Sequence, residues 1–394
     1  MSLPLSYHLR CLFVRKTSTI LTILVVAAVV AVLAWMTAFA QAVKSSLAVA
    51  GDERKIIVLR QGATAESNSV IPVDEFNKLR QLTHLATDAS TGEALLSPEL
   101  MVQVALPRLR DAGRTTANVA VRGVTEKAFQ VHPKIKLLGS SFSKGQPEVI
   151  AGLAAAKQFA GLNVGDTLHM GYGGDRGYRV AGHFSAQGGP MESEIWAYLP
   201  SLMSSYARTM YSSAYLRLRE GGDAAATIEQ IRGPAIQLSA ATEAQYWKEQ
   251  SGTFQLYLLL AYIFLAAMCV AAIFAIANTM FSFVAGRTRE IAMLRTIGFG
   301  RGKILAGFMT ESVLLSLMGG VIGSGLCAAW LALVGNKKDM FGANTFTTLA
   351  FEIKLNPLII IQSLLAVTLV GVVGALWPAT RAARLQVVSA LREP

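Results

Sequence analysis

The sequence predicts a multi-pass α-helical membrane protein with four transmembrane helices and a large α+β extracytoplasmic domain between the first two. Three observations predict this fold class. Of the 394 residues, 53% are hydrophobic and only 15% are charged, which is more apolar surface than one soluble core would need. The apolar residues gather in four long runs, and most of the formal net charge of +11 lies in short segments beside those runs.

The four apolar runs are each long enough to cross a bilayer, which takes roughly 20 consecutive apolar residues in a helix. Residues 17–43, 250–286 and 356–380 contain no charged side chain, and residues 304–334 contain only Glu311. One such run would fit a buried helix of a soluble protein, but four would not. We therefore expect a transmembrane helix in each range.

Positive charge is concentrated in three short segments that these spans place on one side of the membrane. Residues 1–16 contribute +3, residues 287–303 contribute +4 and residues 381–394 contribute +2. Loops rich in Lys and Arg stay on the cytoplasmic side, so both termini are predicted to be cytoplasmic. Residues 44–249 carry a net charge of only +2, and a nucleic-acid partner is therefore not expected.

The remaining chain alternates between the two sides. Residues 1–16 and 381–394 are predicted cytoplasmic tails, 44–249 the extracytoplasmic domain, 287–303 a cytoplasmic loop and 335–355 a short extracytoplasmic loop. The expected location is the cell's inner membrane.

The first apolar run has a second interpretation. Basic residues, an apolar run and "AFAQ" at 38–41 also resemble a cleaved secretory signal with an A-x-A site. The uncharged run 17–43 is longer than the apolar region of a typical signal, and we therefore favour a retained helix. The other three spans would keep their orientation in either case.

The polar insertion 44–249 alternates β-rich runs with helical ones. Alternation of apolar and polar residues predicts half-buried strands, while the residues after Pro72, capped by Asp74, and those near 223–232 predict helices. Two subdomains are expected to meet near residues 140–150. The predicted strands lie at 55–60, 117–124, 134–139, 178–184, 193–200 and 214–220.

A long helix is predicted where the chain returns to the membrane. Residues 243–286 are helical in pattern, with Gly252 as a weak break. At 1.5 Å per residue they would extend about 65 Å, about twice the thickness of the hydrocarbon core. The second span, 250–286, should therefore carry a stalk extension that joins it rigidly to the domain.

The loop 287–303 contains the segment with the most information about function. Helix-forming residues run to Gly298, with Ile291, Leu294 and Ile297 or Gly298 on one face. This pattern indicates a short amphipathic helix along the membrane, ended by glycine. The alternative is a solvated basic loop that only anchors the topology.

The third span has two features of its own. Gly319, Gly320 and Gly323 either break or kink the helix or permit close packing of a neighbouring helix. Glu311 is the one ionisable residue within a span. Intramembrane carboxylates are often functional, but this one lies about two turns from Lys303, and we expect it to reach the interface or to pair with Arg301 or Arg381.

The sequence carries no convincing motif for other chemistry. The sequence has no G-x-x-x-x-G-K-[ST] motif for ATP, and "GYGGDRG" at 171–177 lies between two predicted strands, where a hairpin turn is the better explanation. The five histidines lack ligand spacing, and the three cysteines do not form a disulfide framework or a metal cluster. The motif "SFSK" at 141–144 has no companion motif of a serine acylase. We expect neither an enzyme nor a metal site.

The stretch "RTREIAMLRTIGFGRGKILAGFMTESVLLSLMGGVIG" resembles permeases of the MacB/FtsX/LolC–LolE superfamily of ABC transporters. In that family R-E-I-x-x-L-R-x-I-G follows the second span, and a Glu and G-G-x-x-G lie in the third. "LNVGDTLHM" and "YRVAGHF" resemble the MacB-type periplasmic core domain, and the closing "WPATRAARLQVVSALRE" is also similar, although Val387 replaces the usual proline. The matching residues are Arg289, Glu290, Ile291, Leu294, Arg295, Gly298, Glu311, Gly319, Gly320 and Gly323.

The resemblance implies a permease subunit without a fused ATPase domain. Residues 287–298 would be a coupling helix seated in a groove of a separate cytoplasmic ATPase, which would bind ATP and magnesium while this chain binds no cofactor. The permease would dimerise with itself or a related permease, with a periplasmic adaptor and membrane lipid as further partners. The residues implied in ATPase coupling are Arg287, Arg289, Glu290, Ile291, Leu294, Arg295 and Gly298.

The implied function is mechanotransmission. ATP-driven motion would pass through the spans to the extracytoplasmic domain and drive export or extraction of an amphiphile, a lipid or a lipoprotein. The alternative is a membrane-anchored sensor or adaptor whose extracytoplasmic domain binds a ligand and which has no ATPase partner.

Overall fold

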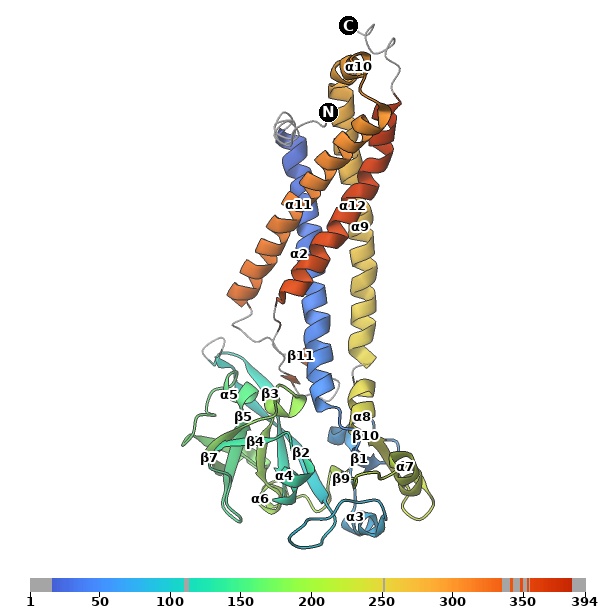
Figure 1. Ribbon diagram of the computed structural model, residues 1–394. Coiled ribbons are helices and arrows are strands. Elements are labelled where there is room, and N and C mark those ends of the chain that lie inside the picture. Colours follow the sequence, from blue (N-terminus) through green and yellow to red (C-terminus); the bar gives the residue numbers. More distant parts are fainter. Residues whose placement is uncertain are drawn as a thin grey trace. The chain divides into compact units, whose positions relative to one another are not determined.

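The computed structural model describes residues 16–109, 113–250, 252–334, 341–342, 348–349, 353 and 355–384 (Figure 1). The chain divides into two compact units. The helical unit contains the four spans and the loop between the second and third. The sheet domain is built from residues 42–255 together with 337–352.

The helical unit confirms the four predicted spans. Its long helices are α2 (Lys16–Ala50), α9 (Gly252–Gly286), α11 (Arg301–Val334) and α12 (Pro357–Ala383). Among the described residues, these are the four helices long and apolar enough to cross a membrane. The last one starts where expected, because Pro357 occupies its first position and the Asn356 side chain accepts a hydrogen bond from the Leu358 amide at 3.3 Å.

The predicted helix over 243–286 is present as two helices, α8 (Glu243–Gln250) and α9. Ser251, between them, lies outside the described residues. The rigid stalk therefore stays a prediction.

The glycines of the third span serve close packing, because α11 runs unbroken through all of them. A Cβ atom on Gly319 would lie 2.5 Å from Val26 Cγ1 of α2, and one on Gly323 would lie 2.4 Å from the Ala27 carbonyl oxygen. On Gly320 it would lie 2.7 Å from Leu364 Cδ2 of α12. Of the two readings of these glycines, close approach of neighbouring helices is correct and the helix break is wrong.

Hydroxyl groups add hydrogen bonds between the transmembrane helices. Ser312 of α11 donates a hydrogen bond to the Gly371 carbonyl of α12 at 2.7 Å. On the other side of the unit, Thr22 of α2 and Thr279 of α9 share a hydrogen bond between their hydroxyls. Such bonds between helices hold a bundle that gains little from hydrophobic burial in lipid.

The sheet domain contains one ten-stranded sheet in the order β10-β1-β9-β2-β3-β8-β5-β7-β4, with β6 paired to β7. A separate two-stranded ladder joins β11 (Phe341–Gly342) to β12 (Thr348–Leu349). The ten strands are β1 (Lys55–Arg60), β2 (Leu96–Pro107), β3 (Thr116–Val124), β4 (Lys136–Gly139), β5 (Glu148–Gly152), β6 (Thr167–Met170), β7 (Arg176–Ser185), β8 (Ile195–Tyr198), β9 (Ser213–Arg217) and β10 (Leu238–Thr242).

Short helices cover this sheet. Asp223 caps one of them, accepting from the amides of Ala225 and Ala226 at 2.9 and 3.1 Å. Asp74 does not cap its helix as predicted, since Pro72 is the N-cap and Asp74 lies in the first turn. The helices are η1 (Glu66–Asn68), α3 (Val73–Lys78), η2 (Leu79–Gln81), α4 (Lys127–Val131), α5 (Leu153–Ala156), η4 (Tyr172–Gly174), η5 (Pro190–Ser193), α6 (Leu199–Ser205) and α7 (Ala224–Arg232).

All six predicted strands are present, and the "GYGGDRG" segment is the connection of the β6–β7 hairpin. The longest strand, β2, was not predicted. The expected division near residues 140–150 does not occur in the sheet, because strands from before and after that point are interleaved. Thus β1 pairs with β9 and β10, and β3 pairs in parallel with β8.

Glycine packing in the helical unit gives a direct test. Gly323→Ala should destabilise the protein by about 1–3 kcal/mol, because the added methyl forces α11 away from α2. The control is Gly325→Ala in the same helix, where an added Cβ meets nothing within 4 Å. That change should be neutral or slightly stabilising. Thermal unfolding of the detergent-purified protein measures both, and equal midpoints would refute the packing role.

Candidate functional site

The loop between the second and third spans forms a helix, as predicted. This is α10 (Thr288–Thr296), and it lies between the end of α9 and the start of α11 (Figure 1). Arg287 occupies the N-cap position without a side-chain cap. The segment is therefore an ordered helix, and the alternative of a solvated basic loop is wrong.

One face of α10 is buried in the helical unit. Ile291 and Ala292 are only 3% and 2% exposed. Ile291 belongs to an apolar cluster with Val284 of α9, Phe308 of α11 and Ala379 of α12. A force on α10 would therefore act directly on three spans.

The helix ends as the glycine predicts. Gly298 has a φ of +103°, a left-handed conformation that a side chain would strain. The Phe299 amide donates to the Leu294 carbonyl at 3.0 Å, and the Gly298 amide donates to the Arg295 carbonyl at 3.2 Å. These two bonds make a Schellman motif, which turns the chain sharply towards α11.

Glu311 forms an ion pair, but not with the residues predicted. Its carboxylate lies 3.0 Å from Nη1 of Arg287, and the two side chains are only 3% and 13% exposed. The predicted partners, Arg301 and Arg381, are not the ones observed. Their places in the fold explain the difference, because Arg287 lies at the turn between α9 and α10, beside the third turn of α11.

The two arginines of α10 differ in their surroundings. Arg295 is half-buried and donates to the Ala383 carbonyl at the end of α12 at 3.3 Å, where a cation also meets the negative end of the helix dipole. Arg289 and Glu290 are exposed. Of the four charged residues assigned to coupling, Arg287 thus pairs with Glu311, Arg295 holds α12, and Arg289 and Glu290 are exposed.

The exposed row of α10 also carries apolar side chains. Arg289, Met293 and Ile297 follow one another four residues apart, and Met293 and Ile297 are 53% and 75% exposed. The prediction that Ile297 could share the buried face is therefore wrong, and Gly298, beyond the end of α10, is exposed as well.

A hollow lies between α10 and the first turns of α11. Its lining includes the apolar Leu294, Phe299 and Phe308, the exposed Glu290 and Lys303, and the pair of Arg287 with Glu311. A hollow lined by both apolar and charged groups can receive a side chain of a partner protein. Among the described residues, no three histidine, cysteine or carboxylate side chains are grouped as a metal site requires.

Two family models match this chain. One describes the MacB-like periplasmic core domain and matches residues 18–233, more than half of the chain, and the other describes the FtsX-like permease C-terminal region and matches residues 262–387. The chain belongs to the MacB-like ABC transporter permeases. With its four spans, this permease is a multi-pass protein of the inner membrane.

Relatives of the permease match shorter stretches. The macrolide export ATP-binding/permease protein MacB of Neisseria meningitidis serogroup A is 33% identical over 144 residues, 36% of this chain and 21% of that protein. The uncharacterized ABC transporter permease YknZ of Bacillus subtilis is 33% identical over 115 residues, 29% of this chain and 26% of its own length. The permease thus spans about a fifth to a quarter of these relatives.

Solved structures also match. One of them is the extracellular domain of YknZ, described as a noncanonic ABC-type transporter from Gram-positive bacteria. It aligns with 48% of this permease and 99% of its own chain, at a TM-score of 0.33 and 14% identity.

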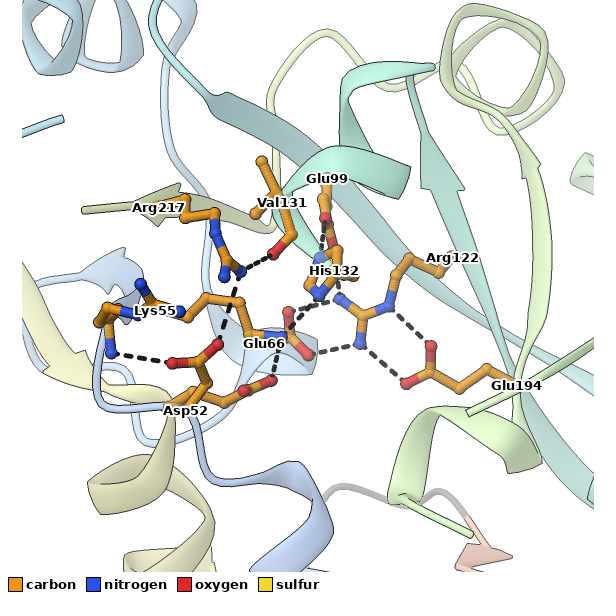
Figure 2. A network of polar contacts seen from close by, with 11 residues as sticks. Asp52, Lys55, Glu66, Glu99, Arg122, Val131, His132, Glu194 and Arg217 are labelled. Atoms are coloured by element: carbon orange, nitrogen blue, oxygen red, sulfur yellow. Dashed lines mark hydrogen bonds and ion pairs between the residues drawn. The ribbon is translucent and has the colours of Figure 1, made fainter. Parts of the chain in front are cut away.

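A buried charge network crosses the MacB-like domain of the permease, and the sequence analysis missed it (Figure 2). At its centre is Arg122 of β3, which is 0% exposed. All five of its N–H donors are used, two by Glu194 at 2.7 and 2.8 Å, two by Glu66 at 2.8 Å, and one by Glu99 at 2.6 Å. Its signal in the sequence is an arginine in the otherwise apolar strand "ANVAVRGV".

The network continues from Glu99 through His132 to Lys55. His132 Nε2 lies 2.8 Å from Glu99, and its Nδ1 lies 2.8 Å from the Lys55 ammonium (Figure 2). Lys55 also pairs with Glu243 of α8 at 2.6 Å. The Lys55 ammonium can only donate hydrogen bonds, so His132 Nδ1 must be the acceptor. His132 is therefore neutral, with its proton on Nε2.

The pKa values follow from this arrangement. Burial, reinforced by the charge of Lys55, lowers the pKa of His132 from 6.5 to about 4. Burial would raise the pKa of Glu99, but His132 and Arg122 outweigh it and lower that pKa to about 2. Burial raises the pKa of both Glu194 and Glu243 and lowers that of Lys55.

The ion pair at α10 can be tested by its removal. Glu311→Gln should lower stability by about 3 kcal/mol, because it removes the carboxylate that pairs with the Arg287 guanidinium where both side chains are largely withdrawn from water. Replacing both residues, as Arg287→Met with Glu311→Leu, should recover most of the loss. Thermal unfolding in detergent measures this, with Glu290→Gln, an exposed acid of the same loop, as control. A Glu311→Gln protein that folds normally but fails in transport would instead assign the carboxylate to substrate movement.

The neutral histidine makes stability depend on pH. Because the pKa of His132 is about 4 in the folded protein and 6.5 in the unfolded chain, the unfolded chain binds the proton first. The stabilisation is complete above pH 6.5 and should fall by about 3 kcal/mol as the pH decreases from 6.5 to 4. The measurement is the unfolding midpoint as a function of pH. Unfolding is followed by tryptophan fluorescence, to which the buried Trp196 contributes.

A comparison of two variants separates the effect of His132 on stability from the effect of carboxylates that bind protons as the pH falls. His132→Gln should flatten the pH dependence between 6.5 and 4, whereas His169→Gln, at an exposed position of the same domain, should keep the wild-type profile. If His132→Gln and the wild type lose stability in parallel, the histidine does not carry the effect.

Proposed function

We propose that this permease transmits ATP-driven motion from a cytoplasmic ATPase to the sheet domain outside the membrane. The observation that carries the proposal is the difference between the two faces of α10, of which one is buried and the other is exposed. Ile291 and Ala292 are packed against the spans, while Met293 and Ile297 are exposed beside Arg289. A helix anchored on one face and open on the other passes a push on its open face to the helices behind it.

The open face suits a protein partner. Its exposed apolar pair and the neighbouring hollow between α10 and α11 offer an anchor site, and the surrounding charges offer a polar rim. We place this face in the cytoplasm together with both termini, because the loop 287–303 carries a net charge of +4.

ATP hydrolysis is assigned to the partner. The 394 residues contain no G-x-x-x-x-G-K-[ST] motif, so ATP and magnesium would bind on the ATPase and this chain would act as a transport subunit. The match to a protein named as an ATP-binding/permease protein supports a functional pairing of the two activities.

A dimer of permeases is the assembly that we propose. The span within α9 buries only 17% of its most apolar window, against 33% to 44% for the other three spans. Its remaining apolar surface is available for a second permease, identical or related, and for lipid. The substrate class that we propose is an amphiphile, lipid or lipoprotein for export or extraction, with a periplasmic adaptor as a further partner.

The first test is isolation of the full chain, tagged, in mild detergent from its native cells. A stoichiometric ATPase subunit should copurify, and reconstitution of the two proteins in nanodiscs should raise the ATPase rate. If no ATPase is recovered even after gentle crosslinking, the proposal fails, and a membrane-anchored sensor with a ligand-binding domain becomes the better explanation.

A charge reversal on α10 tests the coupling itself. Arg289→Glu should reduce the permease-dependent increase in ATPase rate by about tenfold, because it places like charge against the partner's acceptor groups. The matched control is Arg301→Glu, an exposed arginine of the same loop that lies outside α10. Equal rates in the two variants would refute a coupling role for α10.

A further inference from the structure

A groove of about 570 Å³ opens to solvent in the sheet domain. It lies between α3, the first residues of β2 and the turn that precedes α4. No residue of the buried charge network lines it. A groove of this size is within the range of pockets that hold small ligands.

The floor of the groove is apolar and aromatic. Phe76 and Leu96 are 3% and 5% exposed, so they provide a firm surface. Tyr211 packs edge-on against Phe76 with ring centroids 5.1 Å apart, and Tyr198 continues the floor. An apolar chain lying here would lose contact with water along its whole length, which favours binding.

The rim of the groove carries more positive than negative charge. Arg80, Lys127 and Lys144 line it together with Glu93 and Glu126. Lys127 pairs with Glu93, and Lys144 pairs with Glu126 at 2.8 Å. These pairs are largely exposed and therefore weak, so that an incoming anion can replace a carboxylate with little loss.

Arg80 joins the rim to the floor. Its guanidinium lies 6.0 Å from the centre of the Phe76 ring. Thr125 also lines the groove, but its Oγ1 atom is itself buried. The site thus offers a cation beside an aromatic floor.

From this arrangement we propose that the groove binds a single-chain amphiphile with one anionic head group. The apolar chain lies on Phe76, Leu96 and Tyr211, and Arg80 and Lys127 hold the head group. The proposal rests on the transport function above and names its substrate class and one binding site. The ligand reaches the groove from the aqueous side, because the groove is open to solvent.

The experiment uses the full chain alone, in nanodiscs of phosphatidylcholine and without ATPase. The probe is a long-chain fatty acid that carries a diazirine, and crosslinked peptides are located by mass spectrometry. Saturable labelling is expected on peptides that contain Phe76, Tyr198 or Tyr211. The methyl ester of the same probe, which lacks the anionic head, should label these peptides several-fold less.

Two variants shift the affinity in opposite directions. Arg80→Gln should weaken binding about three- to fivefold, and Glu93→Gln, which frees Lys127, should tighten it about twofold. The matched control is Arg60→Gln, an exposed arginine at the end of β1 outside the groove, which should bind as the wild type does. Hydrogen exchange of the domain verifies that each variant is folded.

Labelling confined to the spans, or equal affinities of the Arg80→Gln and Arg60→Gln proteins, would overturn the groove as a binding site. Loss of labelling when phosphatidylglycerol is added to the nanodiscs would identify a phospholipid as the occupant and overturn a single-chain ligand from the aqueous side. Because the assay contains no ATPase, a negative result leaves the transport proposal standing, and absence of an ATPase partner leaves the binding result standing.

Discussion

The fold of the sheet domain depends on one fully buried guanidinium, that of Arg122. Arg122 uses its five N–H groups on three carboxylates that come from η1, β2 and the residue before β8. Removing one partner of such a buried charge costs about 3–5 kcal/mol. The relative positions of these segments are therefore fixed. The interleaved strand order brings distant parts of the sequence together, and it thereby supplies all three carboxylates to Arg122.

The same network ends close in sequence to two of the places where the chain passes between the sheet domain and the helical unit. Lys55 is the fifth residue after α2, and Glu243 is the first residue of α8, which precedes α9. Their ion pair at 2.6 Å ties these two points together, and His132 and Glu99 tie them to Arg122. A domain held this firmly at its entry and exit is suited to move as one body under force, which is the behaviour that transmission of motion requires.

The sequence was most informative where the membrane restricts the choice of residues. Long apolar runs located all four spans because a bilayer admits few alternatives, and Gly298 located the end of α10 because a left-handed residue favours glycine. Contacts between distant residues could not be predicted in this way. Glu194 lies 72 residues from Arg122, and no local pattern records their pairing. The partner of Glu311 was missed for the same reason, since proximity in the sequence pointed to Arg301 while the turn at Gly298 set Arg287 beside it.

Contacts within the helical unit form an unbroken series from α10 to α2. Ile291 and the pair of Arg287 with Glu311 connect α10 to α11. The absent side chains of Gly319 and Gly323 then let α11 lie directly against the backbone of α2. Close-packed helices do not deform continuously, so a displacement at one end must be accommodated by movement of whole helices. The helix α2 leads to β1. Motion of the third span would therefore pass, through the close contacts of these two glycines with α2, to the chain that enters the sheet domain.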